Sequence, residues 1–157
     1  MLFNAKGRLN RKPFICRIAC VWIISGVLHC LAILINDAAK NFAGIPPEYL
    51  SYLIPEMWPL ILAILVVTLV ILLATVFIIW WEVVLYIRRL HDLNLSGWWF
   101  AVTIPCYFTL LIDNLAFSVI LWTFNLGTLF VLCALKGTRG PNRFDEDPLP
   151  DHTSYFA

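Results

Sequence analysis

Long blocks of apolar residues alternate with short polar segments along this chain. The clearest block covers positions 57–81, where twenty-five consecutive residues carry no charged side chain. Charge then returns within a few positions, at Glu82, Arg88, Arg89 and Asp92. A transmembrane helix needs about 20 consecutive apolar residues. The pattern therefore predicts a membrane-spanning helix whose polar chemistry is concentrated at the end where it returns to water.

Apolar blocks also occur at 14–35 and 98–135. The last block is too long for one span at about 1.5 Å per residue, and Asp113 with Asn114 divides it in two. Pro105 should bend the first half because it lacks a backbone N–H. We therefore predict an all-α membrane protein, a four-helix transmembrane bundle whose third and fourth spans form a hairpin, and leave a re-entrant hairpin open as an alternative. The predicted spans are 14–35, 59–87, 98–112 and 115–135, within a single domain at 1–145, followed by a loosely structured cytoplasmic tail at 146–157.

Composition and charge support a membrane protein and indicate its orientation. Hydrophobic residues make up 61% of the 157 positions and charged residues 13%, against roughly 25% charge in soluble domains. Ten of the eleven Lys and Arg residues lie before or at the start of span one, after span two or after span four. Positive charge in short loops favours the cytoplasmic side, so both termini are expected there. A cleavable signal peptide fits poorly, since no Ala-x-Ala site follows the first block.

Two charged residues, Arg17 and Glu82, fall inside the first two predicted spans. They should lie at similar depth, because each is one or two helical turns from the basic end of its span. An isolated carboxylate in a membrane would cost several kcal/mol or become protonated. We therefore predict an ion pair between Arg17 and Glu82 across helices one and two.

The polar segment after span two has a distinctive order: two Arg residues, Leu, His and Asp at 88–92, then Ser-Gly-Trp-Trp at 96–99. Together with Gly-Arg at 7–8, Arg-Lys at 11–12 and Gly-Thr-Arg-Gly-Pro-Asn-Arg-Phe at 137–144, it resembles the family called domain of unknown function 805. These are small bacterial inner-membrane proteins, and the resemblance covers residues 3–148. It implies a multi-pass location in the bacterial inner membrane, but no activity.

Local structure alone would explain much of this segment. Arg88 and Asp92, four residues apart, can pair along one helix face, with Arg89 and His91 pointing elsewhere. A base of the N-terminal segment is the other expected partner of Asp92. Asn94 or Ser96 can cap the start of span three, and Gly97 permits a tight reversal. Trp98 and Trp99, which follow, suit the aromatic belt at the lipid headgroups. The interfacial residues so assigned are Ser96, Gly97, Trp98 and Trp99.

Two functional interpretations compete with this structural one. In the favoured interpretation, three basic segments meet on the cytoplasmic side as a binding or scaffold module for an anionic lipid headgroup or an acidic partner. The residues expected to converge are Arg8, Arg11, Arg88, Arg89, His91, Asp92, Asn142 and Arg143. Alternatively, Arg17, Glu82, His29 and Asn125 line a path for a proton or a small solute.

Catalysis is not expected. Ser96, His91 and Asp92 are suitable residue types, yet adjacent side chains on a helix diverge by about 100°. The three His and five Cys residues show no metal-ligand spacing, so neither a metal nor another cofactor is expected. The expected partners are membrane lipids with anionic headgroups and a membrane-protein partner or second copy of the chain. Nucleic acid is not expected.

Overall fold

The computed structural model describes residues 5–107 and 114–146, apart from a few side chains. Two compact units are present: Met1–Ala19 together with Trp81–Ala157, called unit 1 below, and Cys20–Trp80, called unit 2. Because the first two helices pass from one unit into the other, each contributes residues to both. All ten basic residues grouped by the sequence pattern belong to unit 1, and Lys40 belongs to unit 2.

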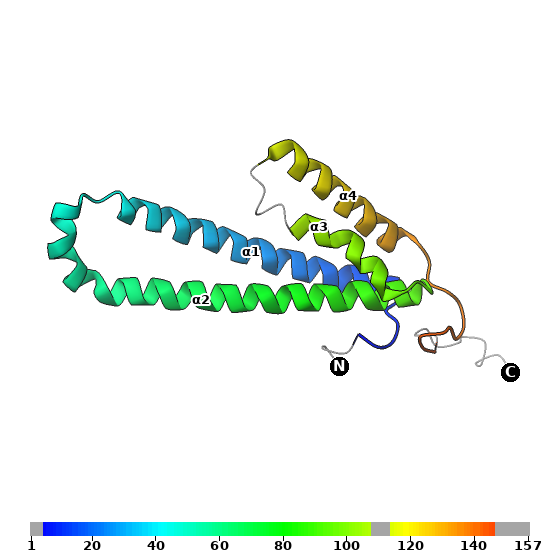
Figure 1. The fold of residues 1–157 in the computed structure, drawn as a ribbon. Helices are drawn as coiled ribbons and strands as arrows, with labels where there is room; N and C mark the ends of the chain where they lie inside the picture. Colours follow the sequence, from blue (N-terminus) through cyan, green and yellow to red (C-terminus); the bar gives the residue numbers. More distant parts are fainter. Residues whose placement is uncertain (1–4, 108–113, 147–157) are drawn as a thin grey trace. The chain divides into compact units, whose positions relative to one another are not determined.

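The described residues form helices and no strand (Figure 1). Helix α1 covers Arg11–Ala43 and α2 covers Pro47–Asp92. A 3₁₀ helix, η1, covers Gly97–Thr103, and α3 continues it over Ile104–Tyr107. Helix α4 covers Leu115–Ala134 and begins at Asn114, whose side chain accepts a hydrogen bond from the backbone N–H of Phe117 at 3.1 Å. The helical class expected from the sequence is confirmed.

Helices α1 and α2 extend beyond the apolar blocks that predicted them. With 33 and 46 residues, they rise about 50 and 69 Å at about 1.5 Å per residue, whereas the hydrocarbon core of a bilayer is about 30 Å thick. Helix α2 continues through Pro55 and Pro59. The two helices are therefore long enough to cross a bilayer and continue beyond it.

Three described helical segments are long and apolar enough to cross a membrane: Arg11–Ala43, Tyr52–Asp92 and Leu115–Ala134. The predicted four-span bundle is not confirmed. Where a third span was expected, the structure has the 3₁₀ helix η1 and then α3, and the rest of 98–112 lies outside the described residues. At about 2.0 Å rise per 3₁₀ residue and 1.5 Å per α residue, η1 and α3 together cover about 20 Å, which is less than a bilayer core.

Unit 1 contains most of the buried residues that the structure describes. Phe14 of α1 and Tyr86 of α2 meet edge to face with ring centroids 5.9 Å apart, and Tyr86 meets Phe100 of η1 at 5.8 Å. Leu132 of α4 is also buried. This aromatic core holds the start of α1, the end of α2 and η1 together, and so positions the polar segments beside it.

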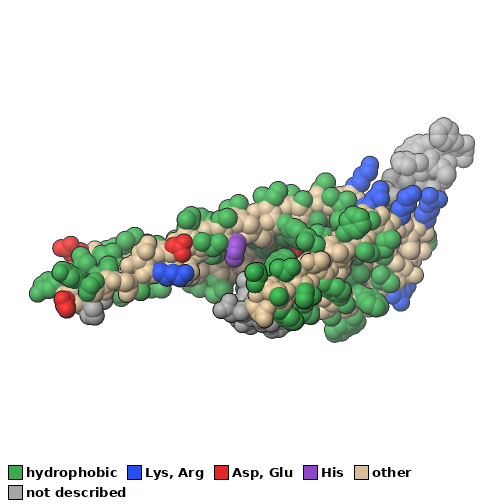
Figure 2. Space-filling view, turned by 90° about the horizontal axis from the view of Figure 1, so that it is seen from above, with side chains coloured by type: hydrophobic (Ala, Val, Ile, Leu, Met, Phe, Trp, Pro, Cys, Tyr) green, Lys and Arg blue, Asp and Glu red, His purple; other side chains and the backbone are tan. Residues whose placement is uncertain are grey.

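Unit 2 buries little. Among its described residues only Val21 and Ile78 are buried, while most Leu, Ile and Val side chains of its helices are exposed. In Figure 2 the helix surfaces of both units are covered largely by hydrophobic side chains. Soluble proteins rarely expose such large apolar surfaces, and lipid tails would cover them. The burial pattern thus agrees with the hydropathy of the sequence.

Candidate functional site

The candidate site is built around the last turn of α2, where the helix ends and the chain reverses. Asn94 adopts a left-handed conformation, with φ 59°, and the backbone N–H of Leu95 donates to the carbonyl of Leu90 at 2.9 Å. This bonding is typical of a helix ended by a left-handed residue, which Asn tolerates better than most residues. The chain therefore reverses at Asn94, three residues before the glycine expected to permit it.

Asp92 lies between two arginines in the interior of unit 1. Its Oδ1 accepts from Nε and Nη2 of Arg8 at 3.3 and 3.2 Å, and its Oδ2 accepts from Nη1 of Arg89. Exposed fractions are 4% for Arg8, 0% for Arg89 and 2% for Asp92. We call these three residues the buried cluster. One carboxylate thus faces two guanidinium groups away from water.

The second positive charge of the buried cluster faces backbone carbonyls. Nε of Arg89 donates to the carbonyl of Leu132 at 2.9 Å, and its Nη2 donates to that of Leu135 at 2.6 Å. Both carbonyls belong to the C-terminal end of α4, where the helix dipole is negative and backbone acceptors lack partners within the helix. Arg89 therefore caps α4 while it neutralises Asp92.

Arg8 attaches the segment that follows α4. Its Nη1 donates to the carbonyl of Gly140 at 2.6 Å, and its Nη2 donates to both oxygens of Thr138, the hydroxyl at 3.1 Å. Thr138 in turn donates its backbone N–H and its hydroxyl to the carbonyl of Asp92, at 2.8 and 3.0 Å. The guanidinium donors of Arg8 are thereby used within the protein.

Position 137 lies so close to Asp92 that it has room only for glycine. A Cβ built on Gly137 would overlap the Asp92 carboxylate. One further bond holds this segment, from the side-chain amide of Asn142 to the carbonyl of His91 at 2.9 Å. The chain after α4 therefore follows the end of α2 closely, and only a residue without a side chain fits at its nearest approach.

The N-terminal segment contacts the same turn from its own side. The backbone N–H of Leu9 donates to the carbonyl of Arg88 at 3.0 Å, and Nη2 of Arg88 donates to the carbonyl of Arg8 at 3.5 Å. His91 Nδ1 lies 3.3 Å from the carbonyl of Gly7. The start of the chain, the end of α2 and the segment after α4 are thus joined at one place, although 84 residues separate Arg8 from Asp92.

The structure brings together the residues expected to converge, and Asp92 pairs with Arg8, a base of the N-terminal segment, which is one of the two expected alternatives. The arginines bonded to Asp92 are Arg8 and Arg89. The expectation that Arg89 points away from Asp92 is wrong: the two lie three apart on the last turn of α2, a spacing that also places side chains on one face. At the edge of the cluster, Arg11 reaches the carbonyl of Ala134 at 3.5 Å, and Arg143 donates to that of Asn94 at 3.0 Å.

The interfacial residues occupy the start of η1. The hydroxyl of Ser96 accepts from the backbone N–H of Trp98 at 3.5 Å, which makes Ser96 the N-cap. Gly97 lies where an added Cβ would be 3.0 Å from Cγ2 of Ile87. Trp98 is 87% exposed and Trp99 is 59% exposed, as suits residues of an aromatic belt.

The polar residues inside the helices are placed as follows. Arg17 is exposed on α1 and Glu82 is half-buried on α2, and their ion pair stays a prediction. His29 is exposed on α1, whereas Asn125 is buried on α4. No group of three or more His, Cys, Asp or Glu residues that could hold a metal ion occurs within 5–107 and 114–146.

Sequence reasoning missed Gly137, Thr138 and the backbone carbonyls of α4. Gly137 and Thr138 belong to a polar segment noted for its composition, but nothing local shows that they contact Asp92. Sequence reasoning also missed Phe144, which stacks on His91 with ring centroids 3.9 Å apart. Each of these contacts joins segments that are remote in the sequence.

Chemically, the candidate site has two parts. In the buried cluster, the arginine donors bond to the Asp92 carboxylate and to backbone carbonyls of the protein. The role of the buried cluster is therefore structural. Around it, six bases of unit 1 among the described residues are exposed, and we call them the basic rim: Lys6, Lys12, Arg17, Lys136, Arg139 and Arg143.

Comparison with known proteins identifies a family whose function is not known. A family model described as "Protein of unknown function (DUF805)" matches residues 2–146. No curated protein and no solved structure matches the chain.

Proposed function

The chain belongs to the family of proteins of unknown function DUF805, and we propose that it is a membrane-embedded module whose basic rim binds the phosphate groups of anionic lipids. In this proposal the rim and both termini face the cytoplasm, and the membrane is the bacterial inner membrane. The main support is that the basic residues fall into two groups: the arginines of the buried cluster, whose donors are bonded within the protein, and the exposed bases of the rim.

The buried cluster would hold the rim in place. Arg8 and Arg89 have their donors satisfied by Asp92 and by backbone carbonyls, so a ligand would have to displace bonds inside the protein. The rim residues Lys136 and Arg139 are exposed, and they follow the end of α4 that Arg89 caps. Binding is therefore assigned to the rim.

Charge favours an anionic surface as the partner. Within unit 1 the exposed acids among the described residues are Asp145 and Glu146, fewer than the bases of the rim. In Figure 2 Lys and Arg side chains stand together on the surface of this unit. Each Lys or Arg near an anionic membrane surface contributes about 1 kcal/mol of binding, so several such bases add up to a definite preference.

The test compares lipid retention by native mass spectrometry of purified protein with phosphatidylglycerol and with phosphatidylcholine. The double variant Lys136→Gln with Arg139→Gln should lose about 2 kcal/mol of preference for phosphatidylglycerol, more than tenfold. The matched control is Lys40→Gln, which removes an exposed base of unit 2 that pairs with Asp37 at 3.8 Å. An unchanged preference in the double variant would contradict the proposal.

A further inference from the structure

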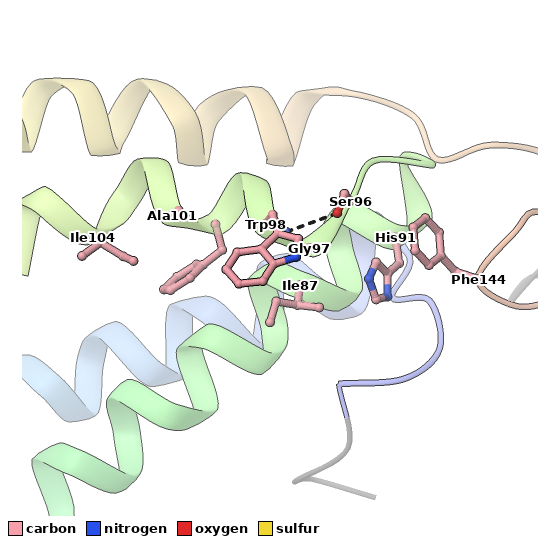
Figure 3. Close-up of a pocket in the computed structure, with 9 residues that line it drawn as sticks. Ile87, His91, Ser96, Gly97, Trp98, Ala101, Ile104 and Phe144 are labelled. Atoms are coloured by element: carbon pink, nitrogen blue, oxygen red, sulfur yellow. Dashed lines mark hydrogen bonds between the residues drawn. The ribbon is translucent and has the colours of Figure 1, made fainter.

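A pocket of about 440 Å³ lies in unit 1, where α2 ends and η1 begins (Figure 3). Its walls are mainly apolar: Ile87 of α2 lies on one side, and Phe100, Ala101 and Ile104 lie along η1 and the start of α3. Small-molecule sites usually have volumes of about 300–1,000 Å³, with apolar walls and a few polar groups that orient the ligand. The pocket falls in this range.

The polar groups of the pocket are His91 and Ser96. Nδ1 of His91 lies 3.3 Å from the carbonyl of Gly7, and because a carbonyl can only accept, Nδ1 is assigned as the donor. Nε2 then faces Gly97, where an added Cβ would be 3.4 Å away. It accepts a hydrogen bond when the ring is neutral and donates one when the ring is protonated.

The guanidinium group of Arg143 lies next to the pocket wall. Phe144 lines the pocket and stacks on the His91 ring with an interplanar angle of 8°, and the guanidinium carbon of Arg143 lies 4.6 Å from the centroid of the Phe144 ring. One Nη2 donor of Arg143 binds the carbonyl of Asn94. The side chain is exposed, and its planar group presents several donors suited to a phosphate.

The location of the pocket suits a lipid. It lies at the end of the apolar segment Tyr52–Asp92, and Trp98, which lines it, is 87% exposed. Exposed Trp side chains concentrate at the level of lipid headgroups. A lipid at this depth would bring an apolar chain and an anionic headgroup to the pocket together.

We propose that this pocket binds one acyl chain of an anionic phospholipid, with the phosphate held by Arg143. This inference rests on the proposed function, since it takes the end of α2 to lie at a membrane surface. It adds a discrete site to the diffuse attraction of the basic rim. The apolar walls along η1 match the chain, while the cation beside Phe144 matches the headgroup.

The test uses the full chain in nanodiscs with phosphatidylglycerol that carries a photoreactive diazirine in one acyl chain. Cross-linked peptides should contain Ile87, Trp98 or Phe144, and unlabelled phosphatidylglycerol should compete. Ala101→Phe fills the pocket from an exposed position and should lower this cross-linking at least about tenfold. The matched control is Ala116→Phe at an exposed position of α4, which should leave it unchanged.

A second variant tests the headgroup contact. Arg143→Gln should retain acyl cross-linking at the pocket but reduce the preference for phosphatidylglycerol over phosphatidylcholine. Cross-links of the native protein spread evenly over the exposed helices would overturn the inference without any variant, as would full cross-linking in folded Ala101→Phe.

The two proposals fail separately. If Lys136→Gln with Arg139→Gln leaves lipid preference intact while Ala101→Phe abolishes cross-linking, the basic rim is wrong and the pocket stands. If the rim variant loses its preference while Ala101→Phe cross-links normally, the pocket is wrong and the rim stands.

Discussion

Replacing Asp92 by Asn should destabilise this protein more than any other single change of similar size. The side chain is 2% exposed and accepts three bonds from the guanidinium groups of Arg8 and Arg89. Asparagine keeps the volume and one oxygen, but it turns an NH₂ group toward an arginine and removes the only negative charge of the buried cluster. Two buried cations then lack a counter-charge.

The expected cost is about 3–5 kcal/mol, as for other buried ion pairs that lose one partner. Total unfolding free energies are about 5–15 kcal/mol, so a large part of the stability would disappear. Loss of Arg8 alone should cost less, because Arg89 and Asp92 remain as a neutral pair. The double variant Asp92→Asn with Arg8→Gln should therefore cost at least about 1 kcal/mol less than the sum of the two single changes.

The assay is reversible unfolding of the purified protein in mixed detergent micelles, followed by tryptophan fluorescence, together with the folded yield. Asp37→Asn is the matched control, since it makes the same chemical change in an exposed ion pair with Lys40, where about 0.5 kcal/mol or less is expected. If Asp92→Asn unfolds like Asp37→Asn, the buried cluster does not hold the fold together and the reasoning fails.

Two further predictions concern backbone geometry, and a third concerns the proposed membrane topology. Gly137→Ala should cost about 1–3 kcal/mol of stability, because its methyl group would overlap the Asp92 carboxylate. The control Gly26→Ala has open space around it and should be neutral or stabilising by about 0.5 kcal/mol. Equal unfolding midpoints for the two variants would refute this. Asn94→Gly should leave the same midpoint nearly unchanged, while Asn94→Val should lower stability by about 1–2 kcal/mol, because a β-branched residue is strained at φ 59°. Reporter fusions should give an outside signal at Tyr49 and Asn114 and an inside signal at His91 and Ala157. An outside signal at Ala157 would refute the proposed topology.

The membrane character and the helices could be predicted from the sequence because they depend on local composition. An uncharged run at 57–81 favours a helix in lipid whatever surrounds it, since its backbone must satisfy its own hydrogen bonds there. The same holds for α4, whose start at Asn114 was marked by the polar pair Asp113-Asn114. Convergence of the basic segments was likewise predicted, on the expectation of four spans with both termini on one side of the membrane.

Only the tertiary structure decided which arginine serves which purpose. Arg88 and Arg89 are adjacent and chemically identical, yet Arg89 is 0% exposed and caps α4, while Arg88 bonds to the backbone of the N-terminal segment. Helix spacing permits either one to pair with Asp92. The choice depends on the carbonyls at the end of α4 and on the close approach of Gly137, which come from parts of the chain more than 40 residues away. Such contacts follow from packing, and no local pattern encodes them.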